Sequence, residues 1–212
     1  MADFRELLNQ TAALHNHLCP RQVLGVRMGM YIADLLSLEL PQTKKRLYTF
    51  IETDGCFADG ISVATGCWLG HRTLRLMDYG KVAATFVDSE TERGVRIWPH
   101  PQARERANSL FSDAKSRWHA QLEAYQVMSH TELFCFREVG LNFSLSDLIS
   151  RPGIRFNCAV CGEEILNERE VLLDGQTVCR SCAGECYWTP KDDVLWLPMH
   201  LGEPSIERQD FT

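Results

Sequence analysis

Four cysteines near the C-terminus have the spacing of a metal site. Residues 158–182 read CAVCGEEILNEREVLLDGQTVCRSC, in which seventeen residues separate two C-x2-C pairs. This spacing is typical of tetrathiolate zinc sites. Zinc prefers four tetrahedral ligands, so four thiolates fill its coordination shell and leave no open position. Four thiolates also suit iron. We predict a structural Zn²⁺ held by Cys158, Cys161, Cys179 and Cys182.

The residues around these cysteines predict the form of the module. Gly162 supplies the small residue that a metal knuckle needs after its second cysteine. The stretch EVLLDGQTVC reads as a hairpin with Asp174 and Gly175 in the turn. A knuckle, a hairpin and then a cysteine pair that opens a helical turn is the order of a treble-clef finger. A fifth cysteine nearby, Cys186, is expected to be a spectator.

A second group of chemically capable residues lies near the N-terminus, in the stretch HNHLCP. His15, His17 and Cys19 alternate, so in an extended segment their side chains would point the same way. Pro20 suits the first turn of a helix, which places Cys19 at a helix N-terminus, where partial positive charge favours a thiolate. One thiolate beside two imidazoles makes a half-site for a transition metal.

A further thiol could complete this site. The stretch ETDGCFADG places Cys56 after an expected strand and at the head of a second helix, with Asp59 one turn later. Two thiols at helix starts can meet at one end of a sheet. Cys67 and Cys135 are interpreted as small buried hydrophobic residues. We therefore predict a core metal site in which His17 and Cys19 bind a transition metal, His15 or Cys56 is a further ligand, and one position is left to water or substrate.

The elements that would position these residues mix helices and strands. Helices are expected over 4–14, 20–40, 57–68 and 101–130, and strands over 46–53, 81–89, 94–100 and 132–139. Because βαβ alternation is not strict, the core is predicted to be α+β, a mixed sheet with packed helices. Gly25 and Gly29 lie one turn apart on a helix face, which indicates close packing against another element, either in the same chain or in a second copy.

The chain is expected to contain two domains. The stretch SRPGIRF over 150–156 breaks the pattern just before the cysteine cluster, so we predict an α+β core over 1–150 and a finger with its tail over 151–212. The second region holds 6 of the 22 basic and 11 of the 28 acidic residues, a net charge of -5, which leaves -1 for the first. Neither region is basic in bulk, so nucleic acid is not an expected partner.

Composition places the protein among ordinary globular proteins. Of its 212 residues, 45% are hydrophobic and 24% are charged. No apolar run approaches the roughly 20 residues of a membrane span, and the first residues lack the pattern of a signal peptide. We expect a cytoplasmic protein without a membrane association. In that reducing compartment, nine cysteines indicate metal ligands or catalytic groups more than disulfides.

Three stretches together resemble the FmdE family, related to the FmdE component of formylmethanofuran dehydrogenase. They are HNHLCPRQVLGVRMG, IETDGCFADGISVATGCWLG and DYGKVAATFVD. The family pattern runs roughly H-G-H-x-C-P-G-x-x-x-G-x-R, then E-x-x-x-C-x-x-D, T-G-C-x-x-G and G-K. Asn16 and Arg21 stand where family members commonly have glycine. The matching positions are His15, His17, Cys19, Pro20, Gly25, Arg27, Glu52, Cys56, Asp59, Thr65, Gly66, Cys67, Gly70, Gly80 and Lys81.

The resemblance implies an α+β core, in many members followed by a treble-clef zinc finger, and homodimers whose protomers intertwine. It also implies a link to a molybdenum or tungsten formylmethanofuran dehydrogenase. On this basis we expect a metal-binding accessory protein, whose core holds a metal or a small-molecule cofactor and whose finger docks a protein partner.

A second function fits the same residues. A thiolate-dependent or metal-dependent enzyme would use Cys19 as nucleophile or ligand, His17 as general base and Lys81 as electrophile or anion clamp. Lys81 follows Gly80 at the head of a strand, where a small residue lets the backbone approach a neighbour and aims the lysine into a cleft. A plain turn is the alternative. A nucleic-acid-binding regulator is disfavoured by the acidic balance.

Overall fold

The computed structural model describes residues 3–149 and 153–189. The chain divides into two compact units, 1–149 and 150–212, and each is described by itself. No helix in the described part of the chain is long and apolar enough to cross a membrane.

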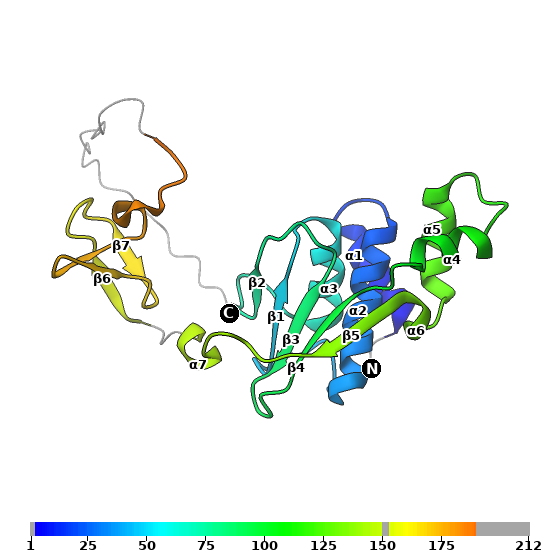
Figure 1. The fold of residues 1–212 in the computed structure, drawn as a ribbon, viewed down its shortest axis with the longest axis horizontal. Helices are drawn as coiled ribbons and strands as arrows, with labels where there is room; N and C mark the ends of the chain where they lie inside the picture. Colours follow the sequence, from blue (N-terminus) through cyan, green and yellow to red (C-terminus); the bar gives the residue numbers. More distant parts are fainter. Residues whose placement is uncertain (1–2, 150–152, 190–212) are drawn as a thin grey trace, which may run out of the picture. The chain divides into compact units, whose positions relative to one another are not determined.

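The first unit is built on a five-stranded mixed sheet with the strand order β2-β1-β3-β4-β5 (Figure 1). β1 pairs with β2 in parallel, and the remaining neighbours are antiparallel. The predicted α+β class is confirmed, although β2 was not predicted because it is short and carries polar residues. The strands are β1 Leu47–Ile51, β2 Leu74–Leu76, β3 Ala84–Asp88, β4 Gly94–Pro99 and β5 Phe134–Glu138.

Helices cover one face of this sheet (Figure 1). The second helix starts at Pro20, as predicted. The helical stretch expected over 101–130 is divided in two, because the Ser116 side chain accepts a hydrogen bond from the His119 N–H and starts a new helix. The helices are α1 Phe4–Ala13, α2 Pro20–Leu36, α3 Cys56–Thr65, α4 Ala103–Leu110, α5 Arg117–Val127, α6 His130–Leu133 and α7 Leu145–Leu148.

Strand β1 is buried on both faces of the sheet. Leu47 and Ile51 belong to the main core beneath the helices. Tyr48 and Phe50 point to the opposite face, where they pack with Val87. That smaller cluster is covered by three residues of the segment that follows β5, Leu141, Leu145 and Leu148.

Glycines allow α2 and α3 to pack in direct contact. A Cβ atom on Gly25 would lie 2.3 Å from the Phe57 carbonyl oxygen. A Cβ atom on Gly29 would lie 2.5 Å from the Ala64 Cβ atom. The later glycine of α2 thus contacts a later residue of α3, so the two helices run parallel. The close packing predicted from Gly25 and Gly29 is therefore confirmed, and its partner is a helix of the same chain. The N-termini of α2 and α3 consequently lie at the same end of the unit.

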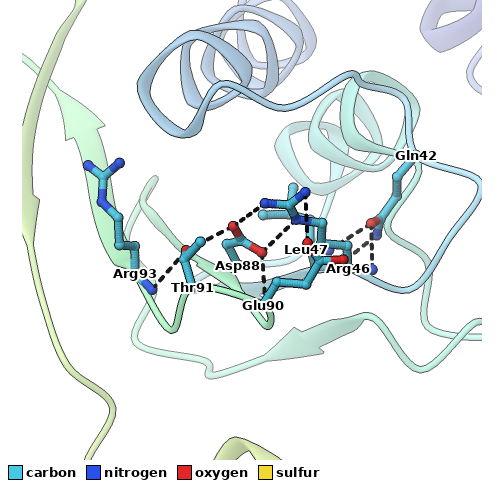
Figure 2. Close-up of polar contacts among 7 residues, drawn as sticks. All are labelled: Gln42, Arg46, Leu47, Asp88, Glu90, Thr91 and Arg93. Carbon is cyan, nitrogen blue, oxygen red and sulfur yellow. Dashed lines mark hydrogen bonds and ion pairs between the residues drawn. The ribbon is translucent and has the colours of Figure 1, made fainter.

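An ion pair between the half-buried Arg46 and the buried Asp88 ties the start of β1 to the end of β3 (Figure 2). Arg46 donates from Nε and Nη2 to the two Asp88 carboxylate oxygens at 2.8 and 2.7 Å. The Thr91 hydroxyl and the Glu90 N–H also donate to this carboxylate, whose side chain is only 1% exposed. The Arg46 hydrogen bonds hold the pKa of Asp88 well below its usual range. Gln42 completes the network by accepting from the Arg46 N–H.

The second unit consists of two short hairpins. The turn predicted at Asp174 and Gly175 is present, with positive φ angles of 49° and 79° at the two residues. Among residues 153–189, the buried cluster consists of Cys158, Ile165 and Val178. The strands are β6 Arg155–Asn157, β7 Glu164–Leu166, β8 Val171–Leu173 and β9 Gln176–Val178, followed by the helical turn η1 Ser181–Glu185.

Replacing Gly25 by alanine should lower the free energy of unfolding by about 2–3 kcal/mol, because the added methyl would overlap the backbone of α3. Gly70→Ala is the matched control, since a Cβ atom there has no neighbour within 4 Å. Urea denaturation of both variants measures the effect. Equal stability of the two variants would contradict the close-packing account.

Asp88→Asn should cost about 2 kcal/mol at neutral pH, because the buried Asp88 carboxylate, which accepts two hydrogen bonds from Arg46, loses its charge. The folded pKa of Asp88 is depressed, so its stabilisation is complete above the unfolded pKa of about 4 and is lost as pH falls through the folded value. The difference in free energy of unfolding between wild type and Asp88→Asn should therefore become smaller below about pH 4. Asp113→Asn, at an exposed position, is the control, and denaturation at several pH values is the measurement.

Candidate functional site

Two predicted ligands, Cys19 and Cys56, lie at the shared N-terminal end of α2 and α3. Cys19 is the N-cap residue of α2, and its backbone N–H donates to the Gln22 side chain at 2.7 Å. Cys56 is the first residue of α3, after Gly55 with a φ of 77°. Burial, and then hydrogen bonding to the Cys19 thiol, raise the pKa of Cys56. The parallel packing of α2 and α3 therefore places both cysteines at the same end of the unit, as expected for two helix starts at one end of the sheet.

The histidines are oriented by the chain itself. His15 Nε2 donates to an Asp59 carboxylate oxygen at 2.6 Å, and His17 Nδ1 donates to the His15 carbonyl oxygen at 2.9 Å. Each ring therefore keeps its other nitrogen for a further partner. A hydrogen bond from one ring nitrogen to a carboxylate or carbonyl is the usual support of a metal-bound histidine.

The extended segment expected over 15–19 is not what forms. Residues 14–16 are a turn after α1, and Asn16 has a φ of 57°. That left-handed conformation favours glycine and, after it, asparagine. Asn16 therefore keeps the backbone shape that the glycine of the family pattern would allow. The prediction that His15, His17 and Cys19 alternate along an extended strand was wrong, because this turn intervenes.

The four predicted core ligands do not converge on one point. Within residues 3–149 and 153–189, only the C-terminal cysteines form a group of three or more such residues whose ligand atoms all lie within 4.8 Å of one another. No third ligand atom of the predicted set joins the two thiols within that distance. A core metal site stays a prediction.

A pocket of about 560 Å³ opens beside Cys19. Arg21 and Leu24 of α2 line it together with His100, and α4 and α5 supply Arg104, Trp118 and Tyr125. Its size is typical of small-molecule sites. Sequence reasoning gave His100 no role. The signal that could have found it is its position between Pro99 and Pro101, directly after a strand of the central sheet.

Arg27 holds α5, the helix that supplies Trp118 and Tyr125 to the pocket, against α2. It is 9% exposed, and its guanidinium donates to the carbonyl oxygens of Tyr125, Gln126 and Met128 at 3.1, 3.0 and 2.6 Å. These carbonyls end α5 and would otherwise lack partners. Arg27 is therefore a positioning residue that fixes α5 against α2.

Lys81 and Gly80 occupy the surface. Lys81 is exposed, and its amine lies 6.0 Å from the centroid of the Tyr79 ring. A Cβ atom on Gly80 would meet nothing within 4 Å, so no close approach of another backbone requires glycine here. Its φ of 64° lies in the left-handed region, which favours glycine. These positions match the plain turn, and a role for Lys81 in the core stays a prediction.

Cys67 is a buried structural cysteine. Its thiol donates to the Leu47 carbonyl oxygen at 3.3 Å and accepts from the Gln42 side chain at the same distance. Burial raises the pKa of this thiol. Cys67 therefore behaves as the small hydrophobic residue that the sequence predicted.

The C-terminal cysteines form a compact cluster in the second unit. The Sγ atoms of Cys161 and Cys179 are 3.9 Å apart, close to the roughly 3.8 Å expected between sulfurs around a tetrahedral zinc ion. The Cys179 N–H donates to Cys158 Sγ at 3.3 Å, and the Cys182 N–H to Cys179 Sγ at 3.4 Å. The cluster thus combines four soft donors, tetrahedral spacing and supporting backbone donors.

The thiols of this cluster perturb one another. Backbone N–H groups of Cys161 and Cys179 lower the pKa of Cys158 to about 6. Hydrogen bonding to Cys179 raises the pKa of Cys182 to about 12. Four thiols this close cannot all ionise without a cation to balance their charge. The donor set therefore fits Zn²⁺.

Two protein families match the chain. Residues 14–135 match the family described as FmdE, Molybdenum formylmethanofuran dehydrogenase operon. Residues 153–185 match the prokaryotic dksA/traR C4-type zinc finger. The second match covers all four clustered cysteines.

A curated protein of Archaeoglobus fulgidus, named a probable S-adenosyl-L-methionine-binding protein, is 36% identical over 203 residues. The match covers 85% of this chain and 53% of that protein, so the chain spans about half the length of this relative. A crystal structure of a tungsten formylmethanofuran dehydrogenase FmdE-like protein from Syntrophus aciditrophicus gives a TM-score of 0.55 at 22% identity. That match covers 89% of this chain and 96% of the other, and it shows a shared fold.

The resemblance noted in the sequence is thereby confirmed. The FmdE family model spans more than half of the 212 residues, so the protein belongs to the FmdE family.

Proposed function

We propose that this protein is a metal-binding accessory protein of a molybdenum or tungsten formylmethanofuran dehydrogenase-type system, acting in the cytoplasm. The observation that carries the proposal is the meeting of the Cys19 and Cys56 thiols at the paired N-termini of α2 and α3. Soft thiolates at that position select a transition metal. His15 and His17 lie in the same segment of chain and have ring nitrogens to spare.

In this proposal the core holds a metal or a small cofactor, and the second unit is a treble-clef finger that holds zinc and docks a protein partner. The finger exposes an unusual amount of apolar surface for a unit with so few buried residues. The exposed apolar residues are Phe156, Val160, Leu166, Leu172, Leu173, Tyr187 and Trp188.

We also propose a homodimer, on the strength of the family resemblance alone. Gly25 and Gly29 no longer support it, because they pack against α3 within the chain. Light scattering at micromolar concentration decides between the mass of one chain and of two.

A thiol-dependent enzyme is the second candidate, and one observation favours it. Cys19 opens into a pocket that also contains His100, so a nucleophile and a hydrogen-bond donor that can stabilise a developing anion border the same space. His17 does not line this pocket, so its role as the general base stays a prediction. Turnover of an unidentified substrate that is lost in both Cys19→Ser and His100→Gln, with metal content unchanged, would favour the enzyme over the accessory protein.

The finger should hold one zinc ion per chain. Cys179→Ser should release it, because a tetrathiolate site loses a quarter of its ligands, and residues 153–189 should lose amide protection while 3–149 keep theirs. Cys186→Ser is the matched control, since Cys186 lies outside the cluster. Elemental analysis and hydrogen exchange are the measurements. Full zinc in the Cys179→Ser protein would refute the tetrathiolate site.

A second metal should depend on Cys19. We expect two metal positions per chain in protein purified without chelators, of which Cys19→Ser loses the core one and keeps the zinc of the finger. Cys67→Ser is the control, because Cys67 is buried away from the pocket. Metal content together with anomalous scattering locates each ion. A single position, at the finger, would exclude a core metal.

A further inference from the structure

We infer that the pocket at the N-terminus of α2 binds the phosphate group of a small aromatic phosphate ester. The inference goes beyond the proposed function and does not depend on a core metal. It rests on the charge of the pocket, on the donors that face it and on its aromatic wall.

The pocket is positively charged. Arg21 and Arg104 line it, and none of its lining residues is acidic. Nor does any carboxylate in the described ranges form an ion pair with either arginine. The pocket also lies at the start of the 17-residue helix α2, where the helix dipole favours an anion. Two cations and a helix N-terminus with no internal counter-charge favour an anionic ligand.

The donors around the pocket suit phosphate more than a carboxylate. Each guanidinium offers several N–H groups in a plane. His100 Nδ1 accepts a hydrogen bond from the Gln102 N–H at 3.1 Å, so its Nε2 carries the proton and is a third donor. Arg104 lines the pocket from α4, opposite the start of α2. Donors from three separate elements exceed what the two oxygens of a carboxylate need, and they match the three terminal oxygens of a phosphate monoester.

The rest of the pocket is suited to a flat apolar body. Trp118 is 45% exposed and Tyr125 is buried, and both contribute rings to the wall, together with Pro99 and Pro101. Aromatic and apolar walls with a few polar groups are typical of sites for ring-bearing ligands. Cys19 borders the same space, so a bound ester would cover its thiol.

The experiment uses the full zinc-loaded chain and phenyl phosphate, the smallest probe that carries both features. The indole N–H signal of Trp118, assigned with Trp118→Phe among the five tryptophans, should shift with a Kd of about 1 mM, as expected for a ligand of this size. Arg21→Gln and Arg104→Gln should each weaken binding about tenfold, the equivalent of one charged hydrogen bond. Both side chains are exposed, so the variants should fold.

Lys44→Gln is the control, because it removes one charge at an exposed position outside this pocket. It should leave the affinity unchanged, and added salt should weaken binding in all proteins. Phenyl phosphate should also slow the alkylation of Cys19 by iodoacetamide, because Cys19 lines the same pocket. Alkylation of Cys19 at an unchanged rate in the presence of the bound ester would overturn this placement of the ligand.

Three further ligands test the chemistry of the site. Phenol lacks the charge, benzoate replaces phosphate by carboxylate, and S-adenosyl-L-methionine carries a cationic sulfonium group. Each should bind more weakly than phenyl phosphate. The inference is overturned if any of them binds as tightly, if phenyl phosphate causes no shift at millimolar concentration, or if the two arginine variants bind like Lys44→Gln.

Discussion

The direct contact between the backbones of α2 and α3 is the constraint on which the rest of the first unit depends. A side chain at Gly25 or Gly60 would separate the two helices. Because they touch in parallel, their N-termini meet, and the residues that begin them become neighbours. Cys19 and Cys56 are far apart in the sequence, and this packing alone brings them together. Since α2 also forms one side of the pocket, the same contact fixes the position of its floor.

Much of this arrangement could be predicted from the sequence, because residues close together in the chain determine where helices, strands and turns begin. Pro20 marked a helix start, strands were expected over 81–89 and 94–100 where β3 and β4 form, and Asp174 with Gly175 specified a tight turn. The zinc ligands could be found because their spacing is set within one short segment.

What could not be predicted depends on contacts between distant segments. The short strand β2 exists because β1 is there to pair with it, and its own three residues are too few to predict a strand. His100 lines the pocket only because the end of β4 lies near α4 and α5. The turn at Asn16 was not predicted, and the expected orientation of His15 and His17 was therefore wrong. Asparagine can adopt a left-handed conformation, but it indicates a turn less clearly in a sequence than glycine does.

Arg27 shows how an arginine shared with a family pattern can be misread. An arginine near a pocket invites the interpretation of a ligand-binding group, yet its donors are occupied by three carbonyl oxygens at the end of α5. Arg27 thus fastens the end of α5 to α2 by hydrogen bonds. When FmdE proteins are compared, an arginine at this position should therefore be taken as a sign that the helix beside the pocket is retained. The identity of the ligand has to be sought in the side chains that line the pocket.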